Sequence, residues 1–184
     1  MASDRPKRRP QPRRFDLVLN VLTVLSLIAG IVLVLWYWPQ LPAQVPIHFN
    51  AAGEADGWGA KGMIWLLPGI SLVLVPGILA LQRFPWLGNV PVTINESNAE
   101  YQYSLVVRLL AILGFFIAVD FLLILIETIA IALGGKGPLG GWILPVLIVP
   151  TIGSILWYLL AMVRQPGEPA SADGSDGDQL SSKA

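Results

Sequence analysis

The chain has 184 residues, and its 12 basic and 12 acidic side chains give a formal net charge of zero. Hydrophobic residues make up 54% of the sequence and charged residues only 13%. The absence of cysteine excludes disulfides, thiolate metal sites and cysteine nucleophiles. Because the charges are concentrated in the tails and connections, this composition indicates an integral membrane protein and not a soluble domain.

The chain begins with a basic tail, residues 1–16. Six of its first fourteen residues are Lys or Arg, against the single acid Asp4. Basic residues next to a membrane helix favour the cytoplasmic side and are attracted to anionic lipid. We therefore expect this tail to be cytoplasmic, with membrane lipid as its partner and no nucleic acid.

Four apolar segments follow, and each is long enough to cross a hydrocarbon core, which takes about 20 helical residues. Backbone groups cannot be hydrated in lipid, so each segment must close its hydrogen bonds as a helix. The sequence predicts an all-α integral membrane protein whose membrane domain, 17–163, forms two helical hairpins. The four predicted helices span 17–38, 62–82, 105–133 and 142–163.

The orientation follows from the remaining basic residues. Arg83 and Arg108 flank the second connection, and Arg164 follows the last helix, whereas Lys61 and Lys136 lie on the other side. The positive-inside rule then places both termini in the cytoplasm of a multi-pass plasma-membrane protein. The first connection, 39–61, becomes an extracellular loop.

This outer loop contains the only histidine of the chain. Several prolines stiffen its entry, apolar and polar residues then alternate as in a strand, and Gly53 and Asp56-Gly57 supply turn positions. We expect a short hairpin in which Ile47, Phe49 and Trp58 face the bilayer or the helix tops. The polar side chains should stay in water or pair with one another: His48, Glu54, Asp56 and Lys61.

The loop also supplies most of the ligand-binding candidates, namely His48, Asn50, Glu54, Asp56, Trp58 and Lys61. Its imidazole and carboxylates are suitable metal ligands, but a zinc site usually has more imidazole or thiolate than one histidine provides. We therefore assign no metal and no cofactor. A structural role, in which these groups bond only within the loop, stays open.

The same loop resembles a known membrane module. The resemblance covers roughly residues 20–70 and rests on an ordered set: Leu41-Pro42, Pro46, His48-Phe49-Asn50, Gly53, Asp56, Trp58, Lys61 and Pro68. This set resembles domain of unknown function 1648, found at the N-terminal end of SdpI-type immunity proteins. The resemblance implies a bacterial membrane protein with a secreted peptide toxin or a membrane protein as candidate partner. Four predicted helices are fewer than those of the full-length immunity proteins.

The third predicted helix carries two acids, Asp120 and Glu127. Seven residues are close to two helical turns, so both lie on one stripe, about 10.5 Å apart along the axis. An ionised acid at the centre of a membrane helix costs roughly 2.5–3.5 kcal/mol, so these side chains must face the bundle interior, find partners or be protonated. Both are added to the ligand-binding candidates.

A tight glycine-rich turn joins the last two helices, and the chain closes with residues 164–184. This tail is rich in Pro, Gly, Ser and Asp and has no apolar face. Such a composition cannot bury enough apolar surface to fold, so we expect it to be disordered.

Three functions remain open at this stage. The sequence favours a module that binds an extracellular or membrane-borne peptide or small ligand. The alternatives are a small proton-coupled carrier, or transport-complex subunit, using Asp120 and Glu127, and a purely structural subunit whose acids join helices, including at a homo-oligomer interface. No HExxH, GxSxG or glycine-rich phosphate loop is present, so we do not expect an enzyme.

Overall fold

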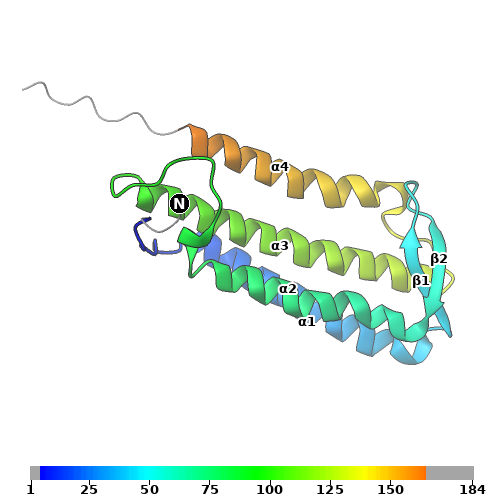
Figure 1. Ribbon diagram of the computed structural model, residues 1–184. Helices are drawn as coiled ribbons and strands as arrows, with labels where there is room; N and C mark the ends of the chain where they lie inside the picture. Colours follow the sequence, from blue (N-terminus) through cyan, green and yellow to red (C-terminus); the bar gives the residue numbers. More distant parts are fainter. Residues whose placement is uncertain (1–4, 165–184) are drawn as a thin grey trace, which may run out of the picture.

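The computed structural model describes residues 5–164 and consists mainly of four long helices that run side by side (Figure 1). They are α1 (Arg14–Tyr37), α2 (Leu66–Leu81), α3 (Ala99–Ala132) and α4 (Ile143–Val163). Between α1 and α2 lies a two-stranded hairpin of β1 (Gln44–Phe49) and β2 (Ala55–Ala60). The predicted fold class, four membrane helices with a structured outer loop, is confirmed.

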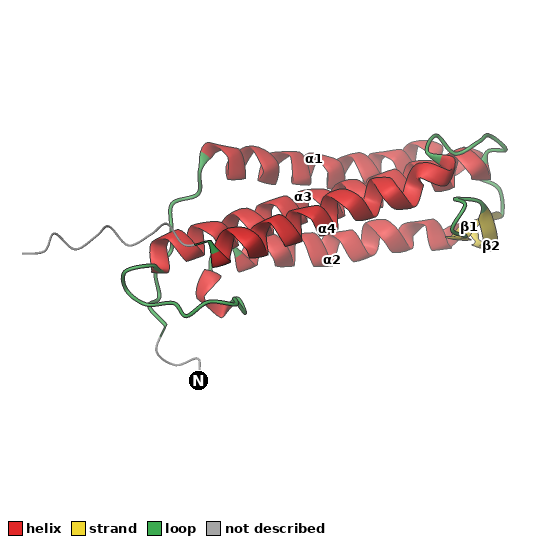
Figure 2. Cartoon of the chain, turned by 90° about the horizontal axis from the view of Figure 1, so that it is seen from above, coloured by secondary structure: helices red, strands yellow, loops and turns green. Residues whose placement is uncertain are grey.

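Helix α3 is the centre of the bundle, because it packs against each of the other three helices (Figures 1 and 2). Small residues on α3 allow this close approach. Ala111 and Ala118 are almost fully buried, and a Cβ at Gly114 would lie 3.5 Å from side chains of α2. Helix α4 packs chiefly against α3 and leaves much of its own surface exposed.

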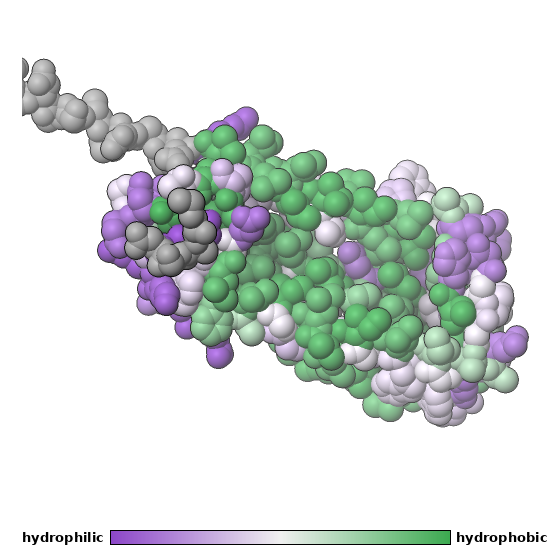
Figure 3. Space-filling view, viewed as in Figure 1, coloured by the Kyte–Doolittle hydropathy of each residue, from purple (hydrophilic) through white to green (hydrophobic). Residues whose placement is uncertain are grey.

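The outside of the bundle is apolar along most of its length and hydrophilic at both ends (Figure 3). Large apolar side chains such as Trp36, Val73 and Val149 are at least two-thirds exposed. A helix that is apolar on all sides is stable when lipid surrounds it. All four helices of the described chain are long and apolar enough to cross a membrane.

Some helix ends differ from the predicted ones. Helix α3 begins at Ala99, earlier than the predicted residue 105, and follows a turn in which the side chains of Asn95 and Asn98 each accept a hydrogen bond from the other's backbone N–H. Hydropathy does not detect such a turn. Helix α2 begins at Leu66, after a 3-10 turn over Lys61–Trp65. Most of the tail predicted to be disordered, 165–184, lies outside the described residues.

Candidate functional site

The hairpin lies at the opposite end of the bundle from the described N-terminal segment (Figure 1). Its strands are antiparallel, with Val45 opposite Gly59 and His48 opposite Gly57, and the register shifts on either side of His48. A strict alternation of apolar and polar faces was the wrong prediction: Val45 and Pro46 are both buried, whereas Ile47 and His48 are both exposed. The irregular register explains this, because bulges turn side chains away from their alternating faces.

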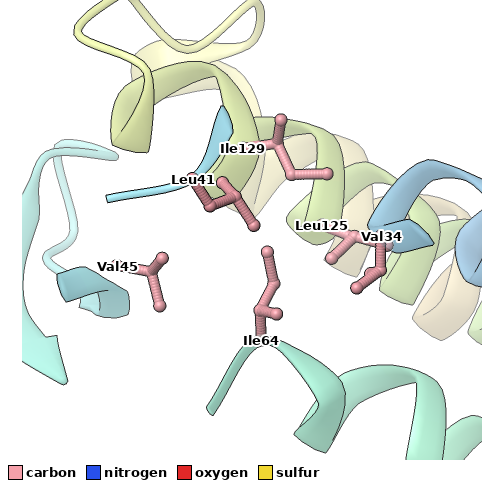
Figure 4. Close-up of a cluster of buried hydrophobic side chains, with 6 residues drawn as sticks. All are labelled: Val34, Leu41, Val45, Ile64, Leu125 and Ile129. Atoms are coloured by element: carbon pink, nitrogen blue, oxygen red, sulfur yellow. The ribbon is translucent and has the colours of Figure 1, made fainter. Parts of the chain in front are cut away.

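A small apolar core holds the base of the hairpin against the helices (Figure 4). Val45 is fully buried there, between residues from the ends of α1 and α3 and from the segments that flank the strands. The core consists of Val34, Leu41, Val45, Ile64, Leu125 and Ile129. Burying one such side chain contributes about 1.5–3 kcal/mol, so the hairpin is anchored as part of the fold.

The tip of the hairpin is built by Asn50 and Glu54. The Asn50 Oδ1 accepts hydrogen bonds from the backbone N–H groups of Ala52 (2.9 Å) and Glu54 (3.0 Å), and its Nδ2 donates to Glu54 Oε2 (3.1 Å). Gly53 has a positive φ of 76°, and a Cβ there would collide with the Gly140 carbonyl. The tip therefore rests directly on the connection between α3 and α4.

His48 and Asp56 pair across the two strands. The His48 Nδ1 lies 2.5 Å from Asp56 Oδ1, which places an imidazole N–H donating to the carboxylate. The side chains are 70% and 45% exposed, as expected for polar groups that stay in water and pair. Ile47 and Trp58 are also about half exposed, at 51% and 48%. This part of the hairpin thus presents an ion pair together with apolar surface.

Lys61 pairs with none of the other polar side chains of the loop, which were expected to stay in water or pair with one another. Its Nζ lies 4.7 Å from the centroid of the Trp38 ring, a cation–π contact. Trp38 in turn contacts Trp65, with ring centroids 6.1 Å apart. Lys61 therefore belongs to an aromatic cluster at the base of the hairpin, away from the His48–Asp56 pair.

Glu127 is almost fully buried, with 1% of its surface exposed. Its Oε1 accepts hydrogen bonds from the backbone N–H groups of Leu139 (2.7 Å) and Gly140 (2.9 Å). These groups lie at the start of the 3-10 turn Gly140–Trp142, which leads into α4, and a carboxylate is favourable at such a position. A Cβ at Gly137 would collide with this carboxylate, so the turn is fitted around it.

Asp120 has a separate partner. Its Oδ2 accepts a hydrogen bond from Thr151 Oγ1 at 3.2 Å, which joins the middle of α3 to α4, and the side chain is only partly buried. Asp120 and Glu127 both bond to the α4 side of α3, in agreement with the predicted stripe. Neither hydrogen-bonds to the loop candidates, and among residues 5–164 no three His, Asp or Glu side chains are grouped as metal ligands.

Two polar contacts at the other end of the bundle did not follow from the sequence. The Arg108 Nε lies 3.4 Å from Oδ1 of the buried Asp16, which joins α3 to α1. The amides of Asn20 and Gln82 exchange two hydrogen bonds of 3.0 Å, which join α1 to α2. The sequence does show polar residues near the ends of the apolar segments, which hints at such contacts. It does not show which residues pair, because the partners lie far apart in the sequence.

Comparison with known proteins assigns part of this architecture. A family model described as Domain of unknown function (DUF1648) matches residues 25–72, from within α1 through the hairpin into α2. An uncharacterized protein of Archaeoglobus fulgidus is 26% identical over 164 residues, which cover 78% of this chain and 88% of the relative. No solved structure matches the chain. The protein is a multi-pass membrane protein with a DUF1648 domain, and the hairpin bearing His48 and Asp56 lies inside that domain.

Proposed function

We propose that the hairpin is a recognition surface, on which His48, Asp56 and Trp58 bind a peptide or small ligand at the outer face of the plasma membrane. The observation that carries this proposal is that one short hairpin exposes both the His48–Asp56 pair and the indole of Trp58, which follows Asp56 by two residues in β2. Tryptophan is enriched where proteins bind partners, and an imidazole and a carboxylate supply donors and acceptors.

The rigidity of the hairpin supports this function. Its base is buried through Val45, and its tip rests on the connection next to Gly140. A surface that is already ordered loses little conformational entropy when a ligand binds. The roles of Asn50 and Glu54 in this proposal are indirect, because both shape the tip that holds the strands in register.

The resemblance to SdpI-type immunity proteins suggests the class of ligand. In this proposal the ligand is a secreted peptide that reaches the membrane surface, and both termini of the chain lie in the cytoplasm. Binding would then produce protection or a signal, through a partner membrane protein or a second copy of the chain. The exposed Trp58 and Ile47 suit an amphipathic peptide, since they offer apolar surface beside the ion pair.

The test uses the full chain in lipid nanodiscs and a library of defined amphipathic peptides. Because an exposed ion pair stabilises a fold by only about 0–1 kcal/mol, His48→Ala and Asp56→Ala should keep their thermal stability while losing peptide binding. Gln44→Ala, another exposed position on the hairpin, is the matched control and should bind like the wild type. Loss of folded protein in both site variants, or unchanged binding, would contradict the proposal.

A small proton-coupled carrier, or a transport-complex subunit, is the second candidate. The observation that favours it is the partly exposed carboxylate of Asp120 in the middle of α3. The buried Glu127 fits a relay less well, because one of its oxygens already accepts two backbone hydrogen bonds.

A further inference from the structure

A second feature lies at the end of the bundle that is distant from the hairpin. A cavity of about 240 Å³ opens there between the segment that precedes α1 and the helices α1, α2 and α3. Two arginines line it, Arg9 from the N-terminal segment and Arg83 from the residues that follow α2. Its other walls include the apolar side chains of Leu17, Leu79 and Val107.

The N-terminal wall of this cavity is held in place by two neighbours of Arg9. The Arg5 Nη1 donates to the Gly88 carbonyl at 2.8 Å, and the Arg8 guanidinium forms an ion pair with Glu96 at 2.6 Å. Both contacts tie the segment to the connection between α2 and α3. Arg9 therefore lines a cavity whose wall is fixed by other residues.

The two cavity arginines are exposed residues, and unlike Arg5 and Arg8 their side chains have no partner among the described residues. Within residues 5–164, neither Arg9 nor Arg83 forms an ion pair or a side-chain hydrogen bond. The amides of Asn20 and Gln82, which also line the cavity, already bond to each other. The cavity thus combines two unpaired guanidinium groups with apolar walls.

This combination matches the chemistry of a phospholipid. A guanidinium donates two parallel hydrogen bonds to phosphate oxygens, and apolar walls accept hydrocarbon. The cavity is lined both by charged residues from the chain segments outside the helices and by apolar residues of α1, α2 and α3, a combination that suits the depth at which lipid headgroups are found. Basic pockets between membrane helices commonly hold anionic headgroups.

We propose that Arg9 and Arg83 bind the phosphate headgroup of an anionic phospholipid, whose acyl chain lies along Leu17 and Leu79. This site is separate from the hairpin and does not depend on the function proposed there. Ordered lipid at this position would hold the N-terminal segment, α1 and α2 together at the membrane surface.

The test measures lipid retained by the purified full chain, using native mass spectrometry with phosphatidylglycerol and phosphatidylcholine as probes. Arg9→Gln combined with Arg83→Gln should lower phosphatidylglycerol retention by about tenfold or more, since charged hydrogen bonds are lost. The matched control combines Lys7→Gln with Arg14→Gln, which removes the same charge from exposed residues outside the cavity. The control should retain phosphatidylglycerol like the wild type, and phosphatidylcholine should be retained weakly by all three proteins.

Two results would overturn this assignment. An equal loss in both double variants would mean that the lipid responds to overall charge and not to a site. Displacement of the lipid by inorganic phosphate at the same concentration would identify a site for free phosphate, with no part played by the acyl chain.

Discussion

At the scale of single residues, the acids of α3 show how the same residue type serves different purposes in one helix. Glu127 is buried and orders a connection through two backbone hydrogen bonds, whereas Asp120 is partly exposed and bonds to a threonine of α4. The spacing of the two acids correctly placed both on one face. Their separate partners come from α4 and the connection that precedes it.

The role of Glu127 in the connection can be measured directly. Glu127→Ala should lower the free energy of unfolding by about 2–3 kcal/mol, because two hydrogen bonds are lost and two N–H groups are left without their partner. Glu127→Gln keeps an oxygen that can accept hydrogen bonds from both N–H groups, so its free energy of unfolding should fall by less. Denaturant titration in mixed micelles measures the difference, and equal losses in the two variants would contradict the assigned hydrogen bonds.

Substitutions at Asp120 distinguish the proposed binding function from the carrier function. Asp120→Asn keeps the size of the side chain and an oxygen that accepts from Thr151, but it removes the titratable proton. We expect this variant to fold as well as the wild type or slightly better, since no carboxyl group remains near the middle of α3, and Asp120→Lys to abolish insertion or assembly. Proton flux in proteoliposomes that needs both Asp120 and Glu127 would instead favour the carrier.

At the scale of elements, the hairpin and the α3–α4 connection act as one unit. The hairpin tip touches the connection at Gly140, and Glu127 holds the same residue from the other side. The two halves of the molecule, α1–α2 and α3–α4, are therefore joined at this end through loops as well as through helix packing. This contact helps to order the hairpin, and with it the surface that is proposed to bind a ligand.

A substitution at Gly53 tests whether the hairpin tip is held by its contact with the α3–α4 connection. Gly53→Ala should destabilise the protein by at least about 1–3 kcal/mol, the usual cost of a strained backbone conformation, since its φ is positive and the new Cβ meets the Gly140 carbonyl. Gly62→Ala is the matched control, because nothing lies within 4 Å of a Cβ there. Thermal unfolding in detergent compares the two, and equal melting temperatures would show that the tip is not held by this contact.

At the scale of the whole molecule, one central helix organises the fold. Because α3 contacts α1, α2 and α4, each of the other helices packs against it. The two ends differ in chemistry: one carries the hairpin and its ion pair, and the other carries the arginine-lined cavity. The positive-inside rule predicts an orientation in which the basic end faces the cytoplasm.

Reporter fusions test that orientation. Alkaline phosphatase should be active when fused within residues 51–57 and inactive near Arg14, Gly88 and Gly167, since the enzyme matures only outside the cytoplasm. A fluorescent protein that folds only in the cytoplasm should give the reciprocal pattern. Phosphatase activity at Gly88 would reverse the assigned topology and move the hairpin to the cytoplasmic side.

The sequence by itself determined the four helices and the hairpin between the first two. These features depend on local properties, the length of apolar runs and the turn chemistry of Gly53, which each segment carries independently of its neighbours. The predicted turn at Asp56-Gly57 was wrong, because both residues lie within β2, and the turn forms earlier, around Asn50 and Gly53. The helix ends were less accurate, as at Ala99, because the polar residues of the first turns of α3 lower its hydropathy without preventing a helix.

The tertiary structure decided which polar groups meet. The irregular register leaves both Ile47 and His48 exposed, Lys61 lies over an aromatic ring, and Asp16 pairs with Arg108 on another helix. The tertiary structure also brings Arg9 and Arg83 to the same cavity. In each case the partners are brought together by helix packing or by strand register, and the energy of such a contact depends on distances that no local pattern of residues specifies.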